Sequence, residues 1–179
     1  MTNPPASVAP PIKTLRMLVG FLAGSLVMFG VVLYFVIPNG DYPPIWVPWA
    51  LGGLAVASHL LCQTTGFSLK PVPAGTLPTE AMGAARAAFQ ASSMLRFALC
   101  ESVAIIALVL SFAVHPASWM TYLIGLVLAL ILLRVNVWPS ATVISKAQRR
   151  LDRDGGQSFL RDALLGMAPG TTASGIIRS

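Results

Sequence analysis

Hydrophobic positions gather in four long segments of this chain, each 18 to 21 residues long with few or no charged side chains. The segments occupy residues 17–37, 45–62, 97–114 and 119–137. At 1.5 Å of rise per residue, such helices reach roughly 27–32 Å, which matches the bilayer hydrocarbon core of about 30 Å. The pattern predicts an all-α fold, a four-helix transmembrane bundle with cytoplasmic amphipathic helices.

The composition favours a membrane environment. Hydrophobic residues make up 55% of the 179 residues and charged residues 10%, and the mean hydropathy is +0.74. A soluble domain usually carries about a quarter charged residues, so most of this chain must face apolar surroundings. We therefore interpret the net charge of +6 as the positive bias of cytoplasmic loops and not as nucleic-acid binding. The two cysteines are too few for a disulfide framework.

The distribution of basic residues predicts the orientation. Connections 38–44 and 115–118 contain no Lys or Arg, and all twelve lie in the N-terminal tail, in residues 63–96, at the end of the fourth segment or in the C-terminal tail. Cytoplasmic loops carry such an excess, so we expect both termini in the cytoplasm. With an Ala- and Arg-leaning composition, we expect the bacterial inner membrane. The aromatic residues expected at the outer interface are Tyr34, Tyr42, Trp46, Trp49, Trp119 and Tyr122, with Trp138 at the inner one.

The two ends of the chain differ from the four-span domain, which we place at residues 13–138. Residues 1–12 are rich in Pro, Ala and Ser and predict a disordered tail. Lys13 and Arg16 could introduce a cleaved signal peptide, but the apolar run is longer than an h-region and no small-residue cleavage site follows. We expect a retained helix. Residues 139–179 predict a cytoplasmic, basic, amphipathic tail.

Three cytoplasmic segments are expected to be ordered. After a Pro-rich loop at 70–78, Thr79 could cap a helix over 80–95, which either lies at the interface or runs directly into the third span. Residues 140–153 form an amphipathic pattern, and residues 158–167 a shorter one. The last two either rest on anionic lipid or dock a partner subunit or soluble domain.

Ionisable residues inside spans are costly and are functional candidates. His59, Glu101 and Arg134 fall at a similar level near the cytoplasmic side. Glu101 and Arg134 stand on consecutive antiparallel helices, so they are expected to form an ion pair that offsets the desolvation of both. Arg96, extending to the interface, is a second possible partner of Glu101. The alternatives are a protonatable carboxylate in an ion path and a ligand pocket. A metal site is a further alternative, and its ligands would be His59, Cys62, Cys100 and Glu101.

The third segment resembles a known helix. Leu95-Arg-Phe-Ala-Leu-Cys-Glu-Ser-Val-Ala-Ile-Ile-Ala-Leu-Val-Leu-Ser-Phe112 is similar to the carboxylate-bearing second helix of the rotary ATP synthase proteolipid, subunit c. The whole chain looks like small four-span bacterial membrane proteins that share this helix. The resemblance implies that Glu101 carries a proton. Subunit c, however, is a two-helix hairpin with a glycine-dense first helix, and Arg134 at matching depth would hold Glu101 ionised.

Two pairs of small residues at i, i+4 spacing permit close helix approach. They are Gly20 with Gly24 and Gly53 with Ala57. We expect them to pack inside the bundle, with homo-oligomerisation as the alternative.

Catalytic motifs are absent from the sequence, so we expect no enzyme activity, no cofactor and no metal. Gly170-Thr-Thr-Ala-Ser-Gly175 resembles a phosphate loop only superficially, because Ile176 stands where Lys is required. The leading hypothesis is an accessory or assembly subunit of a membrane complex, with lipid and other membrane subunits as partners. The alternative is a transport or proton-coupled component using Glu101 with His59 as a relay, followed by an enzyme acting on lipid.

Overall fold

The computed structural model describes residues 11–37 and 42–170, which contain helices and no strand. The helices are α1 Pro11–Val36, α2 Trp46–Thr64, α3 Pro78–Ala113, α4 Trp119–Leu132, the π-helix η1 Leu133–Val137, α5 Ala141–Leu151 and α6 Leu160–Leu165. The all-α prediction is therefore confirmed. Most of the predicted N-terminal tail and the glycine-rich segment after residue 170 lie outside the described residues.

Three helices are long and apolar enough to cross a membrane: Ile12–Val36, Pro78–Ala113 and Trp119–Val137. These helices give the chain the character of a multi-pass membrane protein. α2 is not among them, although it has 19 residues, because His59 and Gln63 interrupt its apolar sequence.

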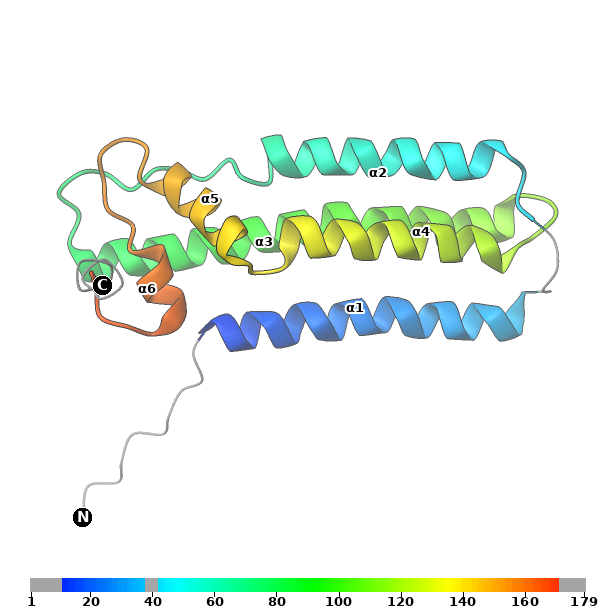
Figure 1. Ribbon diagram of the computed structural model, residues 1–179, viewed down its shortest axis with the longest axis horizontal. Coiled ribbons are helices and arrows are strands. Elements are labelled where there is room, and N and C mark those ends of the chain that lie inside the picture. Colours follow the sequence, from blue (N-terminus) through cyan, green and yellow to red (C-terminus); the bar gives the residue numbers. More distant parts are fainter. Residues whose placement is uncertain (1–10, 38–41, 171–179) are drawn as a thin grey trace, which may run out of the picture.

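The four long helices lie side by side, with α3 and α4 in the middle, α2 on one side and α1 on the other (Figure 1). α3 and α4 approach each other closely at Gly125, where an added Cβ would lie 2.1 Å from the Cβ of Ala107. Small residues at such a crossing let two backbones approach. The buried residues of this contact therefore fix the bundle about the α3–α4 pair.

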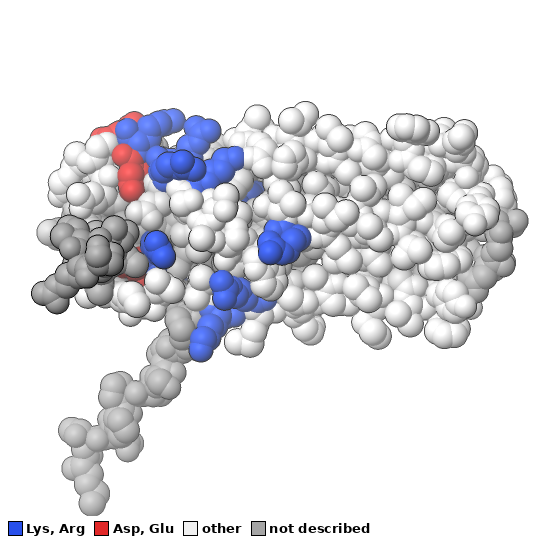
Figure 2. Space-filling model, in the orientation of Figure 1, with Lys and Arg blue, Asp and Glu red and all other residues white. Residues whose placement is uncertain are grey.

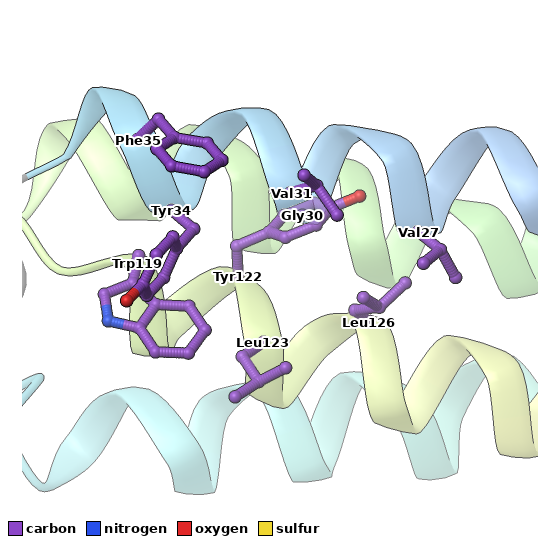
Figure 3. Close-up of a pocket in the computed structure, with 9 residues that line it drawn as sticks. All are labelled: Val27, Gly30, Val31, Tyr34, Phe35, Trp119, Tyr122, Leu123 and Leu126. Carbon is purple, nitrogen blue, oxygen red and sulfur yellow. The ribbon is translucent and has the colours of Figure 1, made fainter.

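α1 is held against α4 by a few specific contacts. The hydroxyl of Tyr122 donates a 2.8 Å hydrogen bond to the carbonyl oxygen of Leu26, and the rings of Tyr34 and Trp119 meet edge to face at 5.3 Å. An apolar groove of about 360 Å³ remains between the two helices (Figure 3). Tyr122 is buried, so it anchors α1 and does not belong to the predicted outer aromatic ring.

α3 is continuous over 36 residues, or about 54 Å of rise. This length settles the question of the 80–95 segment, which runs directly into the third predicted span. The helix begins at Pro78, and Leu77 occupies the N-cap position without a side-chain hydrogen bond. The prediction of a Thr79 cap is therefore wrong; proline at the first helical position supplies the start, because its fixed φ suits the helix and its missing N–H would be unpaired there anyway.

A second core packs the N-terminal half of α3 against α5 and α6. Ala81, Ala85 and Phe89 repeat at four-residue spacing on one face of α3 and are fully buried. The predicted apolar face of α5 packs into this core and consists of Val143, Ile144, Ala147 and Leu151. The chain itself therefore covers the apolar face of α5.

Charge is confined to one end of the molecule. Most Lys, Arg, Asp and Glu on the visible surface gather around α5, α6, the start of α1 and the end of α4, whereas the opposite end of the molecule carries no charge in this view (Figure 2). We call the N-terminal half of α3, the loop 65–77, α5 and α6 the charged end.

We expect Gly125→Ala to destabilise the bundle by about 1–3 kcal/mol, because the added methyl collides with Ala107 and the helices must separate. Thermal unfolding in detergent measures the loss. Gly83→Ala is the matched control, since a Cβ on this helical glycine meets nothing within 4 Å. Equal melting temperatures for the two variants would show that α3 and α4 do not pack at Gly125.

Candidate functional site

A buried arginine lies where the bundle meets the charged end. The side chain of Arg96 is 0% exposed. Its Nη1 donates to the carbonyl oxygen of Asn136 at 2.7 Å and its Nη2 to the hydroxyl of Ser93 at 3.0 Å. Its Nε donates to the carbonyl oxygen of Ser92 at 3.2 Å. All three acceptors are neutral, so the guanidinium charge is stabilised by dipoles and not by a carboxylate.

Aromatic rings complete the surroundings of Arg96. Its guanidinium carbon lies 4.2 Å from the ring centroid of Phe67 and 5.7 Å from that of Phe89. A cation over an aromatic face is attracted by the ring quadrupole, most strongly when water is excluded. Phe67 comes from the loop after α2 and Phe89 from α3 itself, so the arginine joins that loop to the long helix.

The π-helix η1 makes the Asn136 carbonyl available. Trp138 donates its N–H to the carbonyl oxygen of Leu133, five residues earlier, and Pro139 follows with no N–H to donate. The carbonyls at this helix end therefore lack helical donors, and Arg96 supplies one to Asn136. Single π-turns are frequent at functional sites.

The side chain of Asn136 ties α2 to η1. Its Oδ1 accepts a 3.0 Å hydrogen bond from Nε2 of Gln63, and its Nδ2 donates to the carbonyl oxygen of Leu132 at 3.1 Å. Nδ2 also lies 3.2 Å from Nδ1 of His59. Because this amide nitrogen is a donor only, His59 accepts at Nδ1, which assigns the remaining ring proton to Nε2 in the neutral form.

Lys146 extends this network to α5. Its ammonium donates to Oε1 of Gln63 and lies 4.4 Å from the Phe67 ring centroid. Burial first, and then the nearby positive charge of Arg150 and of Arg96, lowers the pKa of Lys146. We call Arg96, Asn136, Gln63, His59, Lys146 and Phe67 the arginine network; it joins α2, α3, η1 and α5.

The approach of Arg96 to the end of α2 requires a glycine. A Cβ added to Gly66 would lie 2.4 Å from Cγ of Arg96 and 2.5 Å from the carbonyl oxygen of Cys62. The hydroxyl of Ser92 donates to the Gly66 carbonyl. The side chain of Arg96 thus lies directly against the backbone at Gly66, just after α2, with no room there for any other residue type.

The predicted cluster of His59, Glu101 and Arg134 is not assembled. His59 enters the arginine network, Glu101 is half-buried outside it, and Arg134 is exposed. Between described residues the ion pair present is Arg153 with Asp154 at 3.3 Å, so the predicted Glu101–Arg134 pair is not formed. Arg96, expected to extend to the interface, is buried instead.

The two cysteines meet between α2 and α3. Their sulfur atoms are 3.9 Å apart as free thiols, and the Cys62 thiol also lies 3.8 Å from the carbonyl oxygen of Arg96. Within the described part of the chain, no three His, Cys, Asp or Glu side chains gather to hold a metal ion. The cysteines therefore act as small packing residues beside the arginine network.

The chemistry of the arginine network favours a structural joint over a proton path. Between His59 and Lys146 stand two amide side chains, which orient hydrogen bonds but do not titrate. The network contains no carboxylate, and His59 faces Asn136 and not Glu101. The hydrogen bonds from Arg96 to Asn136, from Asn136 to Gln63 and His59, and from Lys146 to Gln63 connect different helices, so the arrangement fixes their relative positions.

Sequence reasoning missed the central members of this network. Nothing in the sequence around Gln63 or Lys146 indicates a role in a site, and Phe67 lies in a segment predicted to be a loop. Asn136 was given no role. The available signal was the long Ala-rich stretch before Arg96, because a helix continuous from residue 78 carries that arginine away from the water interface.

We expect the Gln63–Asn136 hydrogen bond to appear as coupling in a double-mutant cycle. Gln63→Ala and Asn136→Ala should each destabilise the protein, and the double variant should lose less than the sum, with a coupling of about 0.5–2 kcal/mol measured by unfolding in detergent. Gln63→Ala combined with Gln90→Ala, an exposed position on α3, should be additive. Additivity in both cycles would contradict the network.

Comparison with known proteins gives no indication of the function, which must therefore be inferred from the geometry of the site. Searches against protein families, curated proteins and solved structures found no match to this chain.

Proposed function

We propose that this chain is a four-span protein of the bacterial inner membrane, with its charged end in the cytoplasm, and that it acts without catalysis by associating with other membrane-embedded subunits. The observation that carries the proposal is the outward orientation of its two pairs of small residues. The arginine network supports it, because the polar side chains that could have lined a pathway between α2, α3 and η1 are used in a joint.

The small residues face away from the bundle. A Cβ added to Gly20, Gly24 or Gly53 meets nothing within 4 Å, and Ala57 is exposed. The expectation that these pairs pack inside the chain is therefore not met. Around Gly24 the surface of α1 is hollowed into a groove of about 420 Å³, bordered by Phe21, Met28 and Phe29. Such a surface suits a second helix, because small residues let helix backbones come close in lipid.

The membrane placement is supported by charge and aromatic residues. Basic residues cluster at the charged end (Figure 2), as cytoplasmic segments do. Tyr42, Trp46 and Trp49 are exposed near the start of α2, at the opposite end (Figure 1), where an outer interface would place them. α2 runs beside α3 and α4, so we include it as the fourth span.

We expect the protein, extracted in mild detergent, to migrate as a complex larger than its own 18.9 kDa chain. Gly24→Leu should lower the complexed fraction at least about fivefold, because the leucine fills the groove that a partner helix would enter. Size-exclusion chromatography with light scattering measures this fraction, and mass spectrometry of the peak identifies its components.

The matched control for this experiment is Gly83→Leu. Gly83 is also a helical glycine with open space around it, but it lies in the charged end. The control should leave the complex intact. A wild-type protein that migrates as a single chain without partners would contradict the association proposal.

A second function, proton-coupled transport through Glu101, is favoured by one observation. The sequence argument against it was that Arg134 holds Glu101 ionised, and these two residues do not pair. Glu101 is a half-buried carboxylate on an apolar helix, and ionisable residues inside membrane spans often mark proton pathways.

Glu101→Gln separates the two functions. If the chain acts by association, the variant should form the same complex as wild type and should support growth and proton flux equally well, because the amide keeps the shape of the side chain. If Glu101 carries protons, flux should be lost although the complex assembles normally. The matched control is Glu80→Gln, at an exposed carboxylate in the first turn of α3.

A further inference from the structure

A small pocket lies at the charged end, between the start of α1, the link from η1 to α5, and α6. Its volume is about 240 Å³. Its lining is mostly apolar, with Ile12, Ile144 and Leu164, and also includes Ser145 and Gln148; Arg16 and Arg161, both exposed, form a basic rim. The pocket is smaller than the roughly 300–1,000 Å³ typical of small-molecule sites, so it suits a head group and not a whole ligand with long chains.

The two arginines of the rim have no acidic partner in the described part of the chain. Arg16 donates one long hydrogen bond, 3.5 Å, to the carbonyl oxygen of Pro139. The ion pair that the structure contains, Arg153 with Asp154, lies outside the pocket. Two exposed guanidinium groups at one small opening repel each other, and an anion between them would relieve that repulsion. Guanidinium groups bind phosphate oxygens well because their donors form a planar fork.

The position of the pocket along α1 matches the head-group region of a bilayer. Arg16 is the last charged residue before the long apolar stretch of α1. Directly after it, Met17 and Phe21 are 66% and 77% exposed. An apolar chain that left the pocket along α1 would therefore run into the hydrocarbon layer. Basic pockets at this level, on the cytoplasmic side, favour anionic lipid head groups.

We propose that the Arg16–Arg161 pocket binds the phosphate of an anionic phospholipid, whose acyl chains leave along the exposed side of α1. This inference rests on the membrane placement of α1 in the proposed function and goes beyond it, because it assigns one lipid to one site. It differs from the predicted adsorption of an amphipathic tail on lipid, since the apolar face of α5 is buried. The lipid would bridge α1 to α6 and so hold the first helix against the charged end.

The test is native mass spectrometry of the full-length protein released from nanodiscs of phosphatidylcholine mixed with phosphatidylglycerol. Wild type should retain one phosphatidylglycerol in preference to phosphatidylcholine. Arg16→Gln with Arg161→Gln should weaken retention about twenty-five-fold, because each basic side chain near an anionic surface contributes about fivefold. Ser145→Trp should do the same without changing charge, since Ser145 lines the pocket and the larger side chain fills it.

The matched control is Arg149→Gln with Arg153→Gln, two exposed arginines that lower the net charge equally and do not line the pocket. Retention unchanged in this control supports the proposal. Equal loss in both double variants would show diffuse surface attraction and overturn it. The proposal would also be overturned if inorganic phosphate bound to the wild type as tightly as phosphatidylglycerol does, because the site would then be an anion site and not a lipid site.

The outcome can be separated from that of the proposed function. If the pocket variants retain lipid normally while the detergent complex is intact, the lipid site alone fails. If the wild type is a single chain and still retains phosphatidylglycerol through the pocket, association alone fails. If alkaline carbonate releases the chain from membranes, both proposals fall.

Discussion

A guanidinium that leaves water must find an acceptor for its N–H groups, and the charged end of this protein is organised around that requirement for Arg96. The carbonyl of Asn136 is exposed to it by the π-turn of η1, and the hydroxyl of Ser93 and the ring of Phe67 are supplied by α3 and by the loop after α2. Gly66 removes the side chain that would block the approach. Since removing any one contributor leaves a buried charge with fewer dipoles, the network couples the helices more tightly than their apolar contacts alone could.

The helices themselves followed from the sequence, because apolar length and amphipathic spacing are local properties. The amphipathic pattern predicted over residues 140–153 corresponds to α5, whose apolar face is buried. Local patterns did not predict the rotation of each helix about its own axis, and so did not predict which neighbour each side chain meets. Each residue turns a helix by about 100°, so residues at one depth can face different directions. Glu101 and Arg134 were expected at one depth but form no ion pair, whereas His59 meets Asn136.

Because local patterns do not give the direction a helix face points, they also did not show which glycines lie inside the bundle. A pair of small residues indicates that another helix can approach the backbone closely, but it does not indicate which helix does so. Gly125 is approached by Ala107 within the chain, whereas Gly20 and Gly24 are left open. Gly66 gave no signal at all, since its role depends on an arginine 30 residues later in sequence and on the continuity of α3. The interior of the bundle is therefore complete, and its outer faces carry the features that suit association.

The continuity of α3 has a mechanical consequence. The helix is a single rod of 36 residues, and about half of it, roughly 27 Å, extends from Arg96 into the charged end. Transmembrane helices change tilt as bilayer thickness changes. No hinge separates the two halves of α3. If the half that follows Arg96 changed its tilt by about 10°, the start of α3 in the charged end would therefore move by roughly 5 Å. A change in the tilt of the span would therefore be passed along α3 to the charged end.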